Sequence, residues 1–162
     1  MIKAIMATDD QGGVSRGVSM PWPKNSNDLQ WFKKNTLSQV VIMGSKTWED
    51  PFMPTPLKHR INILITNKNK SYYPGADKYI NGDIVNEINN LEKKYIDKDI
   101  FIIGGPEIIN QCFDLFKEFY LTRIYGNFNC EKFIDLDQIE KKMKLSEKIN
   151  SDETCHFEIW KK

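Results

Sequence analysis

The sequence predicts an α/β fold built on a largely buried sheet. Short apolar runs typical of strands buried on both faces lie at 2–7, 40–44, 61–66 and 100–103. The second and fourth of these runs are closed by glycines that lead directly into a predicted helix. Ligands of open α/β sheets bind at the carboxyl ends of strands, so both strand–glycine–helix junctions are candidate binding sites.

The composition is that of an ordinary globular chain. Its 162 residues, 40% hydrophobic and 28% charged, predict a single domain. A net charge of +1 predicts neither a nucleic-acid partner nor an anionic membrane partner. No apolar run is long enough for a bilayer span or a signal peptide. Three widely spaced cysteines and two histidines predict reduced thiols in the cytoplasm and no metal site.

The first predicted strand leads into a polar segment, 8–19, that carries three glycines. This segment is not expected to form regular structure. One interpretation is a solvated surface loop. The other is a mobile lid, because long loops beside a core strand often cover a site. In that case Met20, Pro21 and Trp22 would insert an apolar wedge into a cleft.

A helix is predicted to begin near residue 26, with Leu29, Trp31 and Phe32 on its buried face. Asp28 lies in the first turn of this helix. It is either a helix cap that interacts with the helix dipole or an acid that lines a pocket. The second interpretation implies a ligand, because burying an unpaired carboxylate costs several kcal/mol.

The first junction places Ser45, Lys46 and Thr47 at the start of a helix, directly after Gly44. Free backbone N–H groups and the positive helix end would cradle a phosphate there. Many α/β turns share this pattern, so alone it is weak. The third strand is followed by a basic polar run, 67–70, which is either a solvated turn or a contact for an anion.

The second junction is formed by Gly104 and Gly105. Pro106 fits the first turn of the following helix, where its missing N–H is not needed. Glycine at this point lets a ligand approach the backbone closely. Two such junctions are more specific than one, although the GxGxxG dinucleotide fingerprint is absent.

The rest of the chain completes the predicted sheet. An amphipathic helix is expected at 84–95, and strands are expected at 119–125 and 155–160. The charged segment 132–151 is expected to lie at the surface. Neither an internal repeat nor a linker is recognisable, which again indicates one domain.

The whole chain resembles the dihydrofolate reductase family, whose motifs it carries in the family's order and spacing. They are Met20-Pro21-Trp22, Asp28-Leu29-Gln30-Trp31-Phe32-Lys33, Val41-Ile42-Met43-Gly44 with Lys46-Thr47-Trp48, Pro56-Leu57 with Arg60, Ile103-Gly104-Gly105 with Glu107, and Tyr120-Leu121-Thr122. Each is weak alone, but together they leave little room for coincidence.

The resemblance implies a fold. It is a single domain over 1–162 with an eight-stranded, mostly parallel sheet flanked by helices, whose last strand is antiparallel. An adenosine-binding subdomain, approximately 39–95, would be inserted in a loop subdomain. The resemblance also implies a cis peptide bond between Gly104 and Gly105.

The resemblance implies an NADPH-dependent oxidoreductase of one-carbon metabolism that is a target of antifolates. It would reduce 7,8-dihydrofolate to 5,6,7,8-tetrahydrofolate by transfer of a hydride to C6 and of a proton to N5. The Asp28 carboxylate could accept hydrogen bonds from both the 2-amino group and ring N3 of the pterin. It would aid protonation of N5 through water. Trp22 would hold that water, and Thr122 would orient Asp28.

Two sets of binding residues follow from the resemblance. The substrate would contact Ile5, Met6, Asp28, Leu29, Phe32, Phe52, Met53, Leu57, Arg60, Ile103 and Thr122. The cofactor would contact Ala7, Val14, Met20, Gly44, Ser45, Lys46, Thr47, Thr66, Asn67, Lys68, Ile103, Gly104, Gly105, Pro106, Glu107 and Ile108. Arg60 would bind the α-carboxylate of the glutamate tail with its planar fork, although alone it would pass for a surface cation.

The sequence also departs from the family pattern. Ser45 stands where many members have an arginine for the cofactor's 2′-phosphate, and Glu107 adds a negative charge, so the preference for NADPH over NADH stays open. Lys46, Asn67 and Lys68 could replace the missing charge. The run 129–131 replaces a Gly-Asp-Thr run that bonds to the mobile loop in bacterial members, so we predict a difference in lid closure and product release.

Two other functions compete with this one. A pyrimidine reductase of riboflavin synthesis would share the fold and cofactor but would not need Asp28, Arg60 and Thr122. A non-catalytic nucleotide-binding or regulatory module would be expected to lose the acid early. The expected partners are dihydrofolate and folate analogues, with neither nucleic acid nor membrane, and a cytoplasmic monomer is expected.

Overall fold

The computed structural model describes residues 1–17 and 19–162, so Val18, within the predicted loop, lies outside the described residues. The strands are β1 (Ile2–Thr8), β2 (Gly13–Ser15), β3 (Val40–Gly44), β4 (Ile61–Ile65), β5 (Lys78–Ile80), β6 (Ile100–Gly104), β7 (Glu118–Ile124), β8 (Lys132–Phe133), β9 (Lys144–Asn150) and β10 (Cys155–Lys161). The helices are α1 (Ser26–Thr36), α2 (Ser45–Glu49), α3 (Ile84–Lys94), α4 (Pro106–Gln111) and α5 (Leu136–Lys142), with short 3₁₀ helices at Lys70–Tyr72 and Phe113–Leu115.

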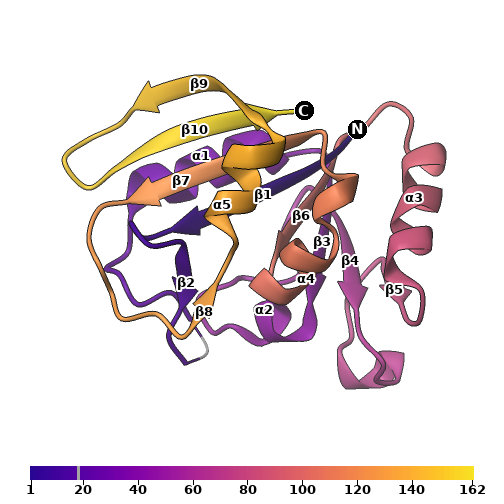
Figure 1. The fold of residues 1–162 in the computed structure, drawn as a ribbon. Helices are drawn as coiled ribbons and strands as arrows, with labels where there is room; N and C mark the ends of the chain where they lie inside the picture. The colour runs from indigo at the N-terminus through magenta and orange to yellow at the C-terminus, as the bar shows by residue number, and fades with distance from the viewer. Residues whose placement is uncertain (18) are drawn as a thin grey trace.

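Eight strands form one twisted sheet at the centre of the molecule, in the order β5-β4-β3-β6-β1-β7-β10-β9 (Figure 1). Neighbours from β5 through β7 are parallel, whereas β10 is antiparallel to both β7 and β9. The predicted α/β fold, with a mostly parallel sheet and an antiparallel last strand, is therefore confirmed. The cis bond expected between Gly104 and Gly105 is also present.

One prediction about an irregular segment was wrong: the segment 8–19 contains β2, which pairs with β8. The charged segment 132–151 lies mostly at the surface, as expected, and it forms β8, α5 and β9. Strand β2 pairs with a segment more than a hundred residues away, and no local pattern shows such a partner. Strand β9 lies at the edge of the sheet and is almost entirely exposed, so it carries charges rather than an apolar run.

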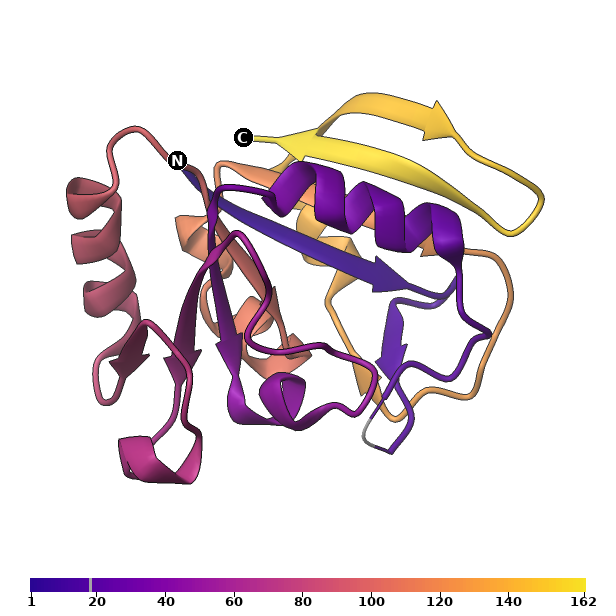
Figure 2. The same cartoon turned by 180° about the vertical axis from the view of Figure 1, so that it is seen from behind.

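Side-chain alternation along the strands divides the core between the two faces of the sheet. One face is covered by α1, whose Trp31 packs in a cluster with Ile5, Val41 and Phe101. Figure 2 shows α1 lying along β1 on this face. The opposite face is covered by α3, α4 and α5, which contribute Ile88, Leu91, Ile109 and Ile139 to the second cluster.

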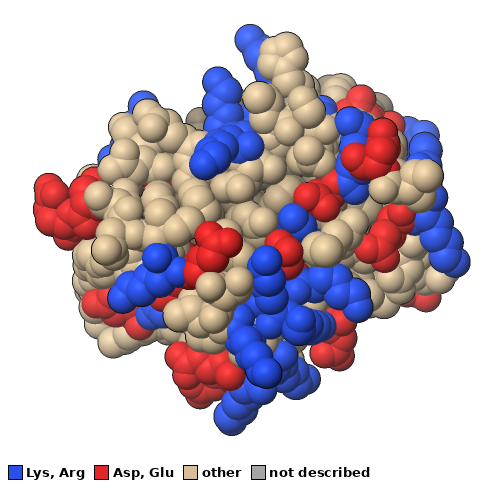
Figure 3. Space-filling model, turned by 90° about the horizontal axis from the view of Figure 1, so that it is seen from above, with Lys and Arg blue, Asp and Glu red and all other residues tan. Residues whose placement is uncertain are grey.

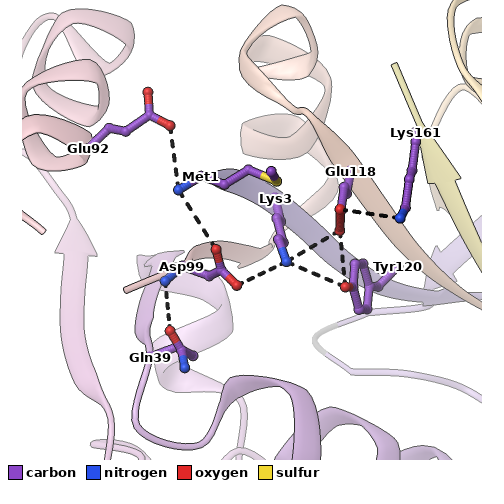
Figure 4. Close-up of polar contacts among 8 residues, drawn as sticks. All are labelled: Met1, Lys3, Gln39, Glu92, Asp99, Glu118, Tyr120 and Lys161. Atoms are coloured by element: carbon purple, nitrogen blue, oxygen red, sulfur yellow. Dashed lines mark hydrogen bonds and ion pairs between the residues drawn. The ribbon is translucent and has the colours of Figure 1, made fainter. Parts of the chain in front are cut away.

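At the amino-terminal edge of the central strands, charged and polar side chains form ion pairs and hydrogen bonds around Lys3 (Figure 4). Lys3 is buried, and its Nζ lies 2.9 Å from Asp99 Oδ2 and 3.3 Å from Glu118 Oε2. The same ammonium group lies over the rings of Phe101 and Tyr120. This edge has its charges satisfied internally, whereas the two glycine junctions lie at the opposite, carboxyl edge.

The surface carries both signs of charge. In the face seen from above, acidic and basic side chains lie side by side, and a group of basic side chains (Lys or Arg) gathers at the lower centre of the view (Figure 3). Among the residues that the structure describes, every helix is too short or too polar to cross a bilayer.

Candidate active site

The start of α1 presents a buried carboxyl group. Asn25 is the N-cap, because its side chain accepts a hydrogen bond of 3.1 Å from the Asp28 backbone N–H. The interpretation of Asp28 itself as the cap is therefore wrong. The Asp28 residue is only 9% exposed. Burial raises the pKa of its carboxyl group, and a contact from the Thr122 hydroxyl opposes this shift.

Aromatic stacking explains why Asp28 lies beside Thr122. The Trp31 ring, one turn further along α1, stacks on Phe157 of β10 with centroids 4.5 Å apart and planes 7° from parallel. Phe157 is in register with Thr122 on β7, and Thr122 is in register with Ala7 on β1. The stack thus docks α1 over the strands that carry the predicted partner of the acid.

The predicted substrate residues divide into two groups by exposure. Ile5, Leu57 and Ile103 are buried in the cluster on the α1 face, and Phe32 and Met53 pack partly buried against it. Leu29 is 40% exposed and Phe52 is 79% exposed. The predicted buried face of α1 is therefore confirmed for Trp31 but wrong for Leu29, which the rest of the described chain covers only in part.

Met6 is set apart from the other predicted substrate residues. It packs partly buried against the cluster on the opposite face of the sheet, because it alternates with Ile5 along β1. Its Cε lies 3.7 Å from the position that a Cβ on Gly104 would take. Met6 is therefore placed beside the second glycine junction, on the face of the sheet opposite α1.

Arg60 lies against the far end of α1. Its Nη1 donates to Thr36 Oγ1 at 3.1 Å, and its Nε donates to the Lys58 carbonyl at 2.9 Å. Thr36 is the last residue of α1, so the guanidinium group connects the 57–60 loop to the helix. Partial burial lowers the pKa of Arg60 without removing its charge.

Sequence reasoning missed Asn62, which fixes that loop. Asn62 is 2% exposed on β4, its Oδ1 accepts from the Leu57 N–H at 2.8 Å, and its Nδ2 donates to the carbonyls of Leu57 and Arg60. A lone polar residue inside the apolar run Ile61–Ile65 was the available signal, because buried polar groups are normally hydrogen-bonded.

The two glycine junctions lie against each other. A Cβ on Gly104 would come 2.8 Å from Thr47 Oγ1, and one on Gly44 would come 3.4 Å from Ile108 Cγ1. Gly104 also has a φ of +147°, which side chains rarely adopt. The first turns of α2 and α4 therefore pack closely at one place on the carboxyl edge of the sheet, and a pyrophosphate bound at this edge would contact both.

One of the charged residues at this edge, Lys132, was not suggested by the sequence. Glu107 Oε1 lies 2.6 Å from Lys132 Nζ and 3.8 Å from Lys46 Nζ. Lys132 belongs to β8, 25 residues further along the chain, so only the fold reveals this contact. Its hydrogen bond is the main cause that lowers the pKa of Glu107.

The segment after β4 is the other predicted contact for an anion. The Lys68 backbone N–H donates to Thr66 Oγ1 at 3.1 Å, and Lys68 Nζ lies 5.2 Å from the centroid of the Tyr72 ring. Asn67 is exposed beside them. Ser45 lies close to Tyr73, whose hydroxyl donates to Glu49. The structure thus places these residues at the carboxyl edge of β3 and β4.

Asp9, also missed, organises the loop after β1. Its Oδ1 accepts from the N–H groups of Gly13 and Gln11 at 2.8 and 2.9 Å, and its Oδ2 accepts from the Phe128 N–H at 3.2 Å. Cys130 Sγ lies 3.5 Å from the same Oδ2. Asp9 is 1% exposed, so this carboxylate joins the loop to the 128–131 segment from inside.

The 129–131 run, which departs from the family pattern, does contact the loop. The Glu131 N–H donates to the Ser15 carbonyl at 2.8 Å, and the Gly17 N–H donates to Glu131 Oε1 at 3.3 Å. Trp22 is buried and its ring meets Phe128 edge-on, whereas Met20 is 38% exposed. Whether lid closure differs from that of bacterial relatives stays a prediction.

Comparisons with known proteins agree with this geometry. The family model described as dihydrofolate reductase matches residues 1–161. The chain belongs to the dihydrofolate reductase family. As a member, it is an NADPH-dependent oxidoreductase that reduces dihydrofolate to tetrahydrofolate. This membership favours the reductase over a pyrimidine reductase or a non-catalytic module.

Similar proteins cover nearly the whole chain. The dihydrofolate reductase of Mycoplasma pneumoniae is 31% identical over 140 residues, which span 85% of this chain and 84% of the relative. That of Bacillus subtilis is 30% identical over 155 residues, which span 94% and 87%. The solved structure of the Enterococcus faecalis enzyme, complexed with NADP(H) and RAB-propyl, has a TM-score of 0.85 at 25% identity and covers 99% of this chain and 95% of its own.

Asp9→Asn should destabilise this reductase by about 1–3 kcal/mol at neutral pH, because an amide would direct N–H groups at backbone N–H donors. Burial opposes ionisation of Asp9, but the hydrogen bonds from backbone N–H groups outweigh burial and lower the pKa of Asp9. The stabilisation is therefore present above the unfolded carboxyl pKa and is lost as pH falls through the folded one. Urea unfolding of both proteins at several pH values should show the difference closing below the usual pKa of 3.8. Equal stability at pH 7 would contradict this role.

Proposed function

We propose that Asp28 binds the pterin ring of dihydrofolate and aids protonation of its N5. The observation that carries this proposal is a single buried carboxyl group, at the start of α1, whose pKa is raised by burial. Without a ligand its ionised form is poorly solvated. The 2-amino and N3 donors of the pterin would stabilise that ionised form through a paired, planar contact.

Proton supply follows from the same group. A carboxyl group with a raised pKa holds a proton closer to neutral pH than an exposed one does, so it is matched to acid–base work. Thr122 fixes its orientation, and Trp22 would hold the water through which the proton reaches N5. NADPH, when bound, supplies the hydride that C6 receives.

The exposed apolar residues form the proposed walls of the substrate site. Leu29 and Phe52 are uncovered in the protein alone, as expected of side chains that a ring system would cover. Ile5 and Leu57 supply a rigid floor because both are buried in the core cluster. The other proposed contacts are Met6, Phe32, Met53 and Ile103.

Arg60 is proposed to bind the α-carboxylate of the glutamate tail. Its contact with Thr36 holds the guanidinium plane against α1 and uses one Nη1 donor, while other N–H donors of the fork are left for a carboxylate. Asn62 keeps the supporting loop rigid.

The cofactor's pyrophosphate is proposed to lie on the two glycine junctions, against Thr47, Gly104 and Gly105. This placement is supported by the close packing of the two junctions, where a Cβ at Gly104 would come 2.8 Å from Thr47 Oγ1. Lys46 would face the phosphates, and Lys68 would face the 2′-phosphate that Ser45 cannot bind by charge. The remaining proposed contacts are Ala7, Val14, Met20, Gly44, Thr66, Asn67, Ile103, Pro106, Glu107 and Ile108.

Three further expectations, on oligomeric state, compartment and subdomain bounds, remain proposals. We propose that the protein acts as a monomer in the cytoplasm, where its three cysteines, which are unpaired in the structure, would stay reduced. We also propose that the adenosine-binding subdomain comprises approximately residues 39–95. This range contains β3, β4, β5, α2 and α3.

Loss of absorbance at the NADPH band with dihydrofolate tests the proposed function. Turnover with NADPH, and a KM for the substrate that rises in Arg60→Gln, would support the reaction and the proposed tail contact. Running the same assay with NADH measures the cofactor preference. Binding of NADPH without turnover would contradict the proposed pterin site and would favour a binding module.

A further inference from the structure

We propose that Lys132 is a positioning residue for the cofactor, because it neutralises Glu107 and so leaves Lys46 free to face the pyrophosphate. This inference rests on the proposed placement of the cofactor at the two glycine junctions. It adds a residue from β8, which belongs to neither junction, to the determinants of NADPH affinity.

One carboxylate oxygen is shared by two lysines from different parts of the fold. Glu107 lies in the first turn of α4, and its Oε1 receives Lys132 Nζ at 2.6 Å and Lys46 Nζ at 3.8 Å. The shorter distance is that of a charge-assisted hydrogen bond, and the longer one is that of a loose ion pair. The side chain of Lys132 is 44% exposed, whereas that of Lys46 is 75% exposed. Lys132 is therefore the principal partner of Glu107.

The contact of Glu107 with two lysines matters because the proposed ligand is an anion. Glu107 is ionised at neutral pH, since the hydrogen bond from Lys132 is the main cause that lowers its pKa. An unneutralised carboxylate at this junction would repel a pyrophosphate. With Lys132 in place, Lys46 is held only weakly and can turn toward a phosphate. Without Lys132, Glu107 would either draw Lys46 away from the phosphates or stand unneutralised beside them, and each outcome weakens cofactor binding.

The same ion pair joins the cofactor junction to the loop sheet. Lys132 is in register with Ser15 of β2, and Asn110 of α4 donates from its Nδ2 to the Phe133 carbonyl at 3.2 Å. Strand β8 is thus attached to α4 at two points and to β2 along its length. Val14, a proposed contact of the cofactor, lies on β2. Lys132 consequently also positions this loop, which would meet the cofactor.

The test measures the Kd for NADPH from quenching of tryptophan fluorescence, at low ionic strength, in a double-mutant cycle. Lys132→Gln should raise the Kd about two- to fivefold, the range that an exposed ion pair controls. Glu107→Gln should lower the Kd, because it removes the carboxylate that opposes the phosphates and frees both lysines. In the Glu107→Gln background, Lys132→Gln should have little further effect. The effect of Lys132→Gln alone should shrink in high salt, because the charges are exposed and screened.

Lys142→Gln is the matched control for loss of one surface positive charge. Lys142 is similarly exposed and also forms an ion pair, with Asp114 at 3.6 Å, but it lies on α5. It should leave the Kd unchanged. An equal rise in Kd for Lys142→Gln, or an equal rise for Lys132→Gln in both backgrounds, would overturn the inference.

Thr47→Val separates failure of this inference from failure of the proposed function. If Thr47→Val weakens NADPH binding and Lys132→Gln does not, the cofactor lies at the junctions but Lys132 has no part in its binding. If neither substitution changes the Kd, the proposed placement of the cofactor itself is wrong.

Discussion

Asp28→Asn should lower turnover by about 10²- to 10³-fold at neutral pH and recover part of it in acid. The reason is that asparagine cannot supply or relay a proton, and general acid catalysis contributes roughly this factor. In acid, solvent protonates N5 more readily and the missing group matters less. Initial rates with NADPH and dihydrofolate between about pH 5 and 9, for both proteins, measure the effect.

A matched control is Asp137→Asn, which removes the exposed first-turn carboxylate of α5. Its rate should follow that of the wild type across the whole pH range. If Asp28→Asn keeps full activity at neutral pH, or loses the same fraction at every pH, the proton role of Asp28 is wrong.

The stability of Asp28→Asn should change in the opposite direction from its activity. Burial raises the pKa of Asp28, so the folded state binds more protons than the unfolded state between the usual and the raised value. Wild-type stability therefore falls as pH rises through this window. Asparagine does not ionise, so the variant does not lose this stability. Its free energy of unfolding at neutral pH should exceed that of the wild type by about 1–3 kcal/mol, the cost of a buried polar group without a full set of partners. The difference should close as pH falls to 3.8, and urea unfolding would show it.

The parts of the fold that the sequence predicted correctly are those with local signals. The apolar runs of β1, β3, β4 and β6 and the glycines that follow two of them depend only on neighbouring residues. The start of α1 was likewise visible, but the sequence left open whether Asp28 caps the helix, and the cap is Asn25. The two alternatives stayed open because a first-turn carboxylate and an N-cap side chain have similar sequence signatures.

The parts that the sequence did not reveal depend on contacts between distant segments. Asp9 matters because Phe128 and Gly13 direct N–H groups at it, and Lys132 matters because β8 passes beside α4. Neither residue type is unusual at its position. Asn62 is the exception, since a polar residue inside an apolar strand was itself a signal.

Gly104→Ala should destabilise the protein by about 2–4 kcal/mol and weaken NADPH binding. Two causes act together at this position. Gly104 has a φ of +147°, which an alanine adopts only with strain, and the new Cβ would lie 2.8 Å from Thr47 Oγ1. Because Thr47 and Gly104 face each other across the two junctions, relief of the clash must move one of the groups proposed to hold the pyrophosphate. Urea unfolding and a fluorescence titration with NADPH measure the two effects.

Gly82→Ala isolates the backbone strain from the steric contact. Gly82 has a φ of +99° but nothing within 4 Å of its added Cβ, so this variant should lose only about 1–2 kcal/mol and bind NADPH normally. Adding Thr47→Ala to Gly104→Ala removes the clashing oxygen and should restore part of the lost stability, while affinity stays low because Thr47 itself is gone. If Gly104→Ala and Gly82→Ala lose the same stability and neither changes NADPH affinity, the contact between the two junctions contributes nothing. The cofactor must then lie elsewhere on the carboxyl edge of the sheet.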